Sequence, residues 1–236
     1  MVTRLRLPSS GSPPVSPAFQ SYTHANGVRR RLPQSDFSAL TTTAQTPDGS
    51  DHLVAGDTSH FQGTSEPLQP GTITNGSTVK LAIQCLEANA GNNLFIQLFI
   101  AVFSNDGATN LQTLLAKTAD GNEIFTSIRN IFHNPALTAG YTLAGGERLV
   151  VEISVTGTPV NSGGTQGHNA SLRFGNNGAG GDLGENDTDT GSTLNPWIEF
   201  ADTLAFQYGG ADIVQHGGMD QFGKGVVARQ IQDRGL

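Results

Sequence analysis

The stretch GERLVVEISVTG, residues 146–157, decides the fold class. Apolar residues occupy alternate positions in it, namely Leu149, Val151, Ile153 and Val155. The positions between them are polar, with Val150 as the exception. Because the side chains of a β-strand point alternately to opposite faces, this period of two predicts a strand with one buried face.

The segments around this strand carry the same signal. NLFIQLFIAVF (93–103) is apolar at nearly every position and rich in β-branched and aromatic residues, which predicts a central strand covered on both faces. The segment 123–133 fits either a short helix or an irregular strand. Turn sequences such as SNDG (104–107) separate the segments. Further strands are predicted over residues 77–87, 111–118, 169–174 and 197–206. Together these patterns predict an all-β fold, an antiparallel β-sandwich or jelly roll.

Composition limits how much of the chain can join that domain. Thirty glycines and 11 prolines beside only 14% charged residues favour turns over long helices, and a hydrophobic content of 36% is low for a single core. Prolines crowd the N-terminus, so residues 1–40 are predicted to form an extended arm. Residues 41–72 are expected to be a polar loop region or weak edge strands, residues 73–208 the β-domain, and residues 209–236 a C-terminal extension.

Charge separates the arm from the domain. Residues 1–40 carry five arginines and one aspartate, a net +4, whereas residues 41–208 carry 16 acids and five bases, a net −11. A basic arm can dock on the acidic surface of a neighbouring copy, which predicts a homo-oligomer; the alternative is a solvated tail. The residues predicted to bind this partner are the apolar anchors Leu5, Leu7, Val15, Phe19 and Tyr22 and the basic triplet Arg29, Arg30 and Arg31.

One loop gathers acidic residues. GDLGENDTDTGS (181–192) contains four carboxylates within a short span, those of Asp182, Glu185, Asp187 and Asp189. Ca²⁺ takes about six to eight oxygen ligands from a bendable backbone, so this loop is a candidate calcium site. It does not follow the EF-hand pattern, because the twelfth position counted from Asp187 is Ile198. The alternative is a solvent-exposed acidic loop between two strands, and no other cofactor is predicted.

The sequence lacks the common catalytic motifs. It contains no H-E-x-x-H, no G-x-S-x-G and no G-x-x-x-x-G-K-[ST], so the chain is predicted not to be an enzyme. The single cysteine, Cys85, lies in an apolar run and is expected to be buried. The longest apolar run, 94–103, is too short to cross a bilayer, and an acidic body disfavours nucleic acid. We therefore expect neither a membrane nor a nucleic acid as partner, and a soluble protein made in the cytoplasm.

Several stretches together resemble a known family. They are RLRLPSSGSPPVSPAF near the start, GERLVVEI, SLRFGNN with GDLGENDTDT, and NPWIEF. As a set they resemble small virion structural proteins of tailed bacteriophages, in which a Pro/Ser-rich opening leads into a β-rich, jelly-roll-like domain. The resemblance covers roughly residues 1–20 and 145–206 and implies a structural role in the virion. The chain departs from this pattern by continuing well past its last predicted strand.

The expected function is that of a bacteriophage virion structural protein, a head decoration or cement protein that binds the capsid lattice. Its partners would be other virion proteins, the major capsid protein first, and its location would be the virion after synthesis in the host cytoplasm. A tail, neck or fibre component is the close alternative. A β-sandwich carbohydrate-binding module is the second alternative, although the aromatic residues that would line its binding face make up only 7% of the chain.

Overall fold

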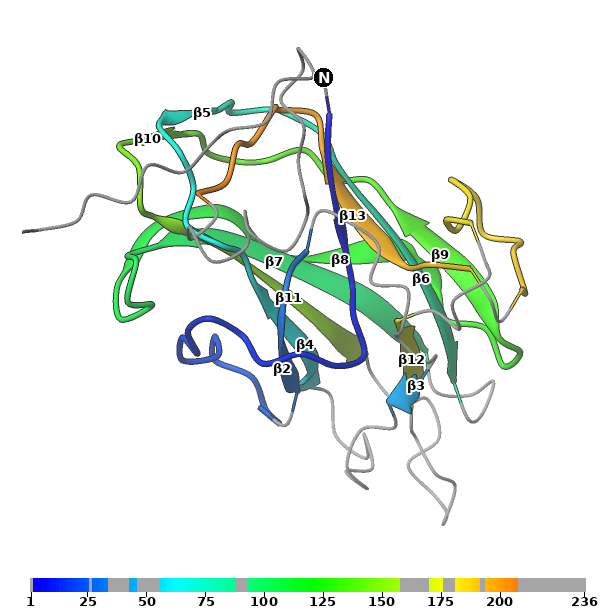
Figure 1. The fold of residues 1–236 in the computed structure, drawn as a ribbon. Helices are drawn as coiled ribbons and strands as arrows, with labels where there is room; N and C mark the ends of the chain where they lie inside the picture. Colours follow the sequence, from blue (N-terminus) through cyan, green and yellow to red (C-terminus); the bar gives the residue numbers. More distant parts are fainter. Residues whose placement is uncertain are drawn as a thin grey trace, which may run out of the picture.

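The fold is all-β, as the sequence predicts, and its strands form two main sheets (Figure 1). The computed structural model describes residues 2–25, 27–33, 43–45, 56–87, 93–157, 170–175, 181–191 and 194–207. Within these residues every regular element is a strand, and no helix is long and apolar enough to span a membrane. The C-terminal extension predicted for residues 209–236 lies outside the described residues.

The first sheet has five strands in the order β2-β4-β11-β7-β8. Their bounds are Val28–Arg31, Gly56–Thr64, Arg148–Gly157, Leu94–Phe103 and Asn110–Glu123. All neighbours in this sheet are antiparallel except β2 and β4, which run parallel. The strand predicted over 93–103 is β7, which lies between β11 and β8 and is buried along nearly its whole length.

The second sheet has six strands, five of them in the order β1-β13-β6-β12-β3 and the sixth, β9, paired with the other edge of β6. Their bounds are Thr3–Arg6, Trp197–Phe200, Val79–Glu87, Ala170–Phe174, Thr43–Gln45 and Arg129–His133. A small separate ladder joins β5 (Gly71–Ile73) to β10 (Tyr141–Leu143). The second sheet is antiparallel throughout.

The two sheets face each other across one hydrophobic core. Phe61 of β4 stacks on Phe174 of β12, with ring centroids 4.8 Å apart and planes inclined by 16°, so this pair connects the two layers. Alternate residues of β6, including Leu81 and Cys85, point into the same core and are fully buried. The predicted burial of Cys85 is thereby confirmed.

Strand β11, which contains the alternating pattern of residues 146–157, has both of its faces covered. Val151 and Ile153 belong to the central core, whereas Val150 packs in a separate cluster with Phe99 and Phe103 on the opposite face of the sheet. The exception in the alternating pattern therefore marks a second buried surface. What covers that surface comes from the beginning of the chain.

The ambiguous segment 123–133 forms strands rather than a helix. Residues up to Glu123 continue β8, and after a bend the chain enters β9, whose backbone pairs with β6 from Leu81 to Cys85. The spacing of isoleucines in this segment fits a helical face, but the edge of β6 supplies a ladder of backbone hydrogen bonds that a helix could not use.

The interpretation of residues 41–72 as loop or weak edge strands was wrong for β4. This strand lies inside the sheet, between β2 and β11, and the side chain of Phe61 is fully buried in the core. Its other face carries His60, Gln62 and Thr64, which are also buried. The polar residues of that face favour a solvent-exposed edge, but in the fold they are covered by another part of the chain instead of by water.

That covering part is the N-terminal segment, and its interpretation as an arm outside the domain was also wrong. β1 is an edge strand of the second sheet, and β2 is an edge strand of the first (Figure 1). Between them the chain crosses the outer face of the first sheet, where the backbone N–H of Gln20 lies 3.3 Å from a carboxylate oxygen of Glu152 on β11. The domain that was predicted to begin at residue 73 therefore includes the N-terminus.

Candidate functional site

The N-terminal strand is held by the segments that carry the family resemblance. β1 pairs antiparallel with β13, so that Leu5 lies opposite Ile198 and Arg4 lies opposite Glu199. Leu5 and Ile198 are both fully buried in the central core. The start of the chain, RLRLP, and the late stretch NPWIEF are thus neighbours in space.

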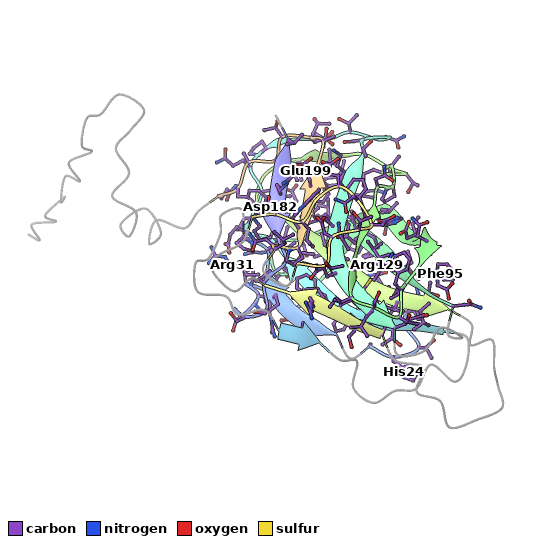
Figure 2. All side chains as sticks on the ribbon, turned by 90° about the vertical axis from the view of Figure 1, so that its right-hand side faces the viewer. His24, Arg31, Phe95, Arg129, Asp182 and Glu199 are labelled. Atoms are coloured by element: carbon purple, nitrogen blue, oxygen red, sulfur yellow. The ribbon has the colours of Figure 1, made fainter. Side chains whose placement is uncertain are left out.

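Ion pairs hold β1 in place on the face opposite to Leu5. Arg4 contacts Asp182 and Glu199, each at 2.7 Å, and its guanidinium lies 3.8 Å from the centre of the Trp197 ring. Arg6 pairs with the same Asp182. Burial alone would raise the pKa of Asp182, but hydrogen bonds from Arg6 and Arg4 outweigh burial and hold that pKa below its usual value. Asp182 and Glu199, both labelled in Figure 2, are the two acids that contact Arg4.

A second set of contacts fixes the crossing segment on the first sheet. Tyr22 meets Phe19 edge to face, with ring centroids 6.5 Å apart, and the Arg29 guanidinium lies 4.5 Å from the centre of the Phe19 ring. Glu152, fully buried beneath them, accepts a hydrogen bond of 2.7 Å from Nε2 of Gln62. Burial raises the pKa of Glu152, and burial together with the nearby Glu152 charge raises the pKa of Tyr22.

The residues predicted to bind a partner subunit are used by this chain itself. Leu5 and Leu7 are 0% and 1% exposed and belong to the central core, which contradicts their assignment to an interface. Val15 packs beside Gly107 in the turn after β7. Arg30 donates to the carbonyl of Ser9 at 3.0 Å, and Arg31 pairs with Glu66 at 2.8 Å. Phe19, Tyr22 and Arg29 form the cluster described above.

The four acids of the predicted calcium loop turn to different partners. Asp182 holds Arg4 and Arg6, whereas Glu185 pairs with Lys80 on β6 at 2.8 Å. Asp187 accepts the backbone N–H of Phe132 at 2.8 Å, and Asp189 accepts the backbone N–H of Gly184 at 2.7 Å. Within the described part of the chain, no three His, Cys, Asp or Glu side chains come together as metal ligands. The contacts of these four acids tie the loop to β1, β6 and β9.

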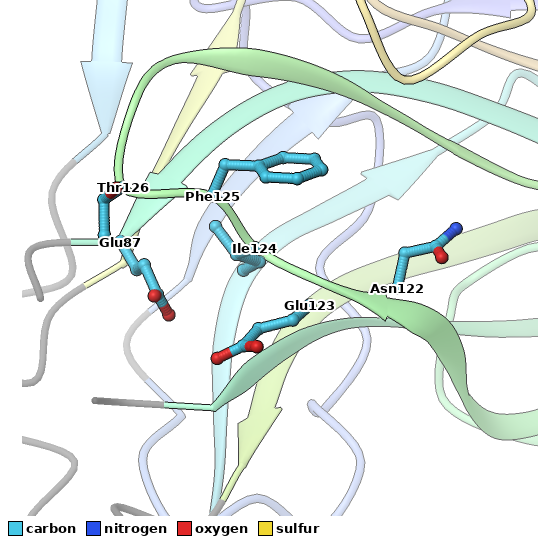
Figure 3. Close-up of a pocket in the computed structure, with 6 residues that line it drawn as sticks. All are labelled: Glu87, Asn122, Glu123, Ile124, Phe125 and Thr126. Atoms are coloured by element: carbon cyan, nitrogen blue, oxygen red, sulfur yellow. The ribbon is translucent and has the colours of Figure 1, made fainter. Parts of the chain in front are cut away.

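A pocket that sequence reasoning missed lies at one end of the sandwich (Figure 3). It has a volume of about 310 Å³ and forms where the end of β6 meets the chain leaving β8. The residues that line it are Glu87, Asn122, Glu123, Ile124, Phe125 and Thr126. A signal was present in the sequence, because Glu87 continues the alternation of Leu81, Ile83 and Cys85 and so falls on the buried face of its strand.

Two carboxylates dominate this pocket. Glu87 is only 2% exposed, and Figure 3 shows its carboxylate and that of Glu123 pointing into the same space. Oε2 of Glu87 and Oε1 of Glu123 are buried and have no hydrogen-bond partner in the part of the chain that the structure describes. Burial, and then the charge of Glu123, raise the pKa of Glu87 to about 7, although a hydrogen bond from the backbone of Leu94 acts in the other direction.

Comparisons with known proteins add no argument about this chain. No family model and no curated protein matches the chain. Among solved structures, a CocE/NonD family hydrolase from Staphylococcus aureus is similar with a TM-score of 0.43 and 10% identity, over 85% of this chain and 36% of that one. An α-amino acid ester hydrolase gives a TM-score of 0.42 and 11% identity, over 84% and 36%.

A viral protein is also among the similar structures. The VP2 subviral particle of infectious bursal disease virus gives a TM-score of 0.24 and 11% identity, over 69% of this chain and 34% of that one. The chain thus spans about a third of the length of each of these proteins. With TM-scores below 0.5, the similarities carry no argument about function.

Proposed function

We propose that this chain is a structural protein of a tailed-bacteriophage virion, a head decoration or cement protein that binds the major capsid protein and carries out no catalysis. One observation supports the proposal most. The stretches on which the family resemblance rests are far apart in the sequence, yet they meet in the fold: RLRLP begins within β1, NPWIEF ends in β13 beside it, and Asp182 binds Arg4 and Arg6.

This meeting supports the resemblance because the stretches depend on one another. Arg4 and Arg6 of the first stretch need Asp182 of the third and Glu199 of the last as partners. A buried or half-buried charge that loses its partner is costly, so these stretches stabilise the fold together. The stretches therefore form one structural unit, and this is the support that the fold gives to the proposal.

The architecture also suits a protein that must withstand assembly on a particle. An exposed sheet edge can pair with other chains and cause aggregation. Here the edge strands beside β13 and β4 are β1 and β2, each only four residues long, and such short edge strands limit pairing of this kind. Binding to the capsid would then use surface side chains rather than strand edges, and the protein would reach the virion after synthesis in the host cytoplasm.

A particle inventory tests the proposal. Virions from the host lysate are banded on a density gradient, and their proteins are counted by mass spectrometry. We expect this chain in stoichiometric amounts, and we expect the purified full-length chain to co-sediment with capsids that lack it. An acidic β-sandwich of similar size from an unrelated source is the control for non-specific binding. Absence from the particles would contradict the proposal.

Immunogold labelling separates the positions on the particle. Gold on the head supports a decoration or cement role, whereas gold confined to the tail, neck or fibres contradicts the head assignment. Retention on polysaccharide gels without any binding to particles would instead favour the carbohydrate-binding alternative.

A further inference from the structure

We propose that the pocket between Glu87 and Glu123 binds an alkylguanidinium cation, the chemical group of an arginine side chain. The inference does not depend on the virion role. It rests on a buried carboxylate with a free oxygen, on a second carboxylate facing it, and on a pocket of the right size beside them.

Two carboxylate oxygens of the pocket lack hydrogen-bond partners within the described part of the chain. Oε2 of Glu87 and Oε1 of Glu123 are shielded from solvent and accept no hydrogen bond from any described residue. A buried acceptor that lacks a partner costs free energy, and the cost rises when the group is ionised. A cation that donates hydrogen bonds to both oxygens would remove that cost.

The described residues do not supply this cation. Arg129 is close in the sequence, but its guanidinium lies over the ring of Phe125, 4.7 Å from the ring centre. Lys80, on the same strand as Glu87, pairs with Glu185. Among the described residues, neither Glu87 nor Glu123 forms an ion pair with a Lys or Arg side chain. The two carboxylates therefore lack a basic partner there.

The second step is the shape and lining of the pocket. A volume of about 310 Å³ is far larger than a bare metal ion needs and falls at the lower end of the range for small-molecule sites. Ile124 and Phe125 give the pocket an apolar wall next to the carboxylates. A cation on a methylene stem fits this combination, since such stems bury along apolar surface while the charged head remains polar.

The third step selects the head group. The carboxylates come from different sheets, Glu87 from β6 and Glu123 from β8, and they enter the pocket from two directions (Figure 3). A guanidinium is planar and carries five N–H donors in a fixed fork, so one head group can donate to two carboxylates at once. The exposed Asn122 and Thr126 place the rim of the pocket at the surface, where a ligand can enter.

The test is a titration of the full-length chain with n-butylguanidinium chloride at pH 8, followed by the amide NMR signals of residues 123–126. We expect saturable shifts confined to this end of the sandwich. Butylurea, which has nearly the same shape but no charge, should cause none. Glu87→Gln and Glu123→Gln keep the side-chain size and should each weaken binding at least tenfold, with circular dichroism confirming that the variants are folded.

Glu185→Gln is the matched control, because it removes the same charge from an exposed pair elsewhere and should leave binding unchanged. N-acetyl-arginine amide distinguishes the source of the ligand. Binding as tight as that of butylguanidinium supports a side chain presented by a partner protein, and exclusion of the amide with retention of butylguanidinium supports a free small cation.

Two results would overturn the inference. One is the absence of saturable shifts with butylguanidinium in the tens of millimolar range. The other is equal binding by wild type and Glu87→Gln, because a ligand that ignores this carboxylate does not use the pocket as described.

Discussion

Replacing Leu5 with alanine tests whether the N-terminus belongs to the core of this chain. Leu5 is fully buried, and its partner across the ladder, Ile198, is fully buried as well. Truncating a buried leucine to alanine costs about 2–5 kcal/mol, because transfer free energy is lost and a cavity remains. Against a total stability of about 5–15 kcal/mol, that is a large fraction.

The assay is urea unfolding followed by tryptophan fluorescence, with Trp197 on β13 as the reporter beside the mutated strand. A loss of about 3 kcal/mol should also lower the melting temperature by roughly 6–12 °C for a domain of this size. Val2→Ala is the matched control, because Val2 is 54% exposed and its truncation should change stability by no more than about 0.5 kcal/mol. The reasoning is refuted if Leu5→Ala unfolds at the same urea concentration as Val2→Ala.

Two further predictions concern charges. Glu87→Gln should flatten the pH dependence of stability. The pKa of Glu87 is raised from 4.5 to about 7, so its contribution to stability is complete below about pH 4.5 and falls by about 1–3 kcal/mol as the pH rises through about 7. In urea unfolding, the stability of the variant relative to wild type should therefore be higher at pH 8 than at pH 5. Asp182→Asn should lower the free energy of unfolding by about 1–2 kcal/mol at pH 7, because two arginines lose a charged partner. The difference in stability between variant and wild type should shrink as the pH falls through the lowered pKa of Asp182, below about 3.8. Glu185→Gln, which breaks a more exposed pair with Lys80, should cost less than about 1 kcal/mol in the same experiment.

Strands that bury one regular face could be predicted from the sequence. The patterns at 77–87, 93–103, 146–157 and 169–174 correspond to β6, β7, β11 and β12 within a few residues. The prediction over 197–206 holds only for β13, which ends at Phe200, because the chain then leaves the sheet and Asp202 accepts a hydrogen bond from the backbone of Thr74.

The N-terminal strand was missed although its signal was present. In RLRLP, Leu5 and Leu7 alternate with Arg4 and Arg6, which is the period of a strand. The prolines that follow led the whole segment to be interpreted as an arm. What the pattern could not reveal is the partner strand, because pairing of β1 with β13 joins residues almost 200 positions apart.

The pocket was only partly predictable. The position of Glu87 on the buried face of β6 follows from alternation, but the approach of Glu123 does not. β8 pairs with β7 through several register shifts, and these bulges decide which side of the sheet each residue of β8 faces. The polar face of β4 was unpredictable for a related reason, since Gln62 and its neighbours are buried by a segment remote in sequence.

The central claim is that the N-terminal strand completes the sandwich of its own chain, and a disulfide tests it most directly. Arg4 and Glu199 are register partners, and directly opposed residues of an antiparallel pair have Cα atoms about 4.5–5.5 Å apart, within disulfide range. The double variant Arg4→Cys, Glu199→Cys is prepared with Cys85→Ala, which removes the only native cysteine, and is oxidised at low protein concentration. We predict a single band at monomer mobility on a non-reducing gel, with no free thiol remaining. Disulfide-linked dimers or longer chains would contradict the claim, because they would mean that β1 pairs with a neighbouring copy.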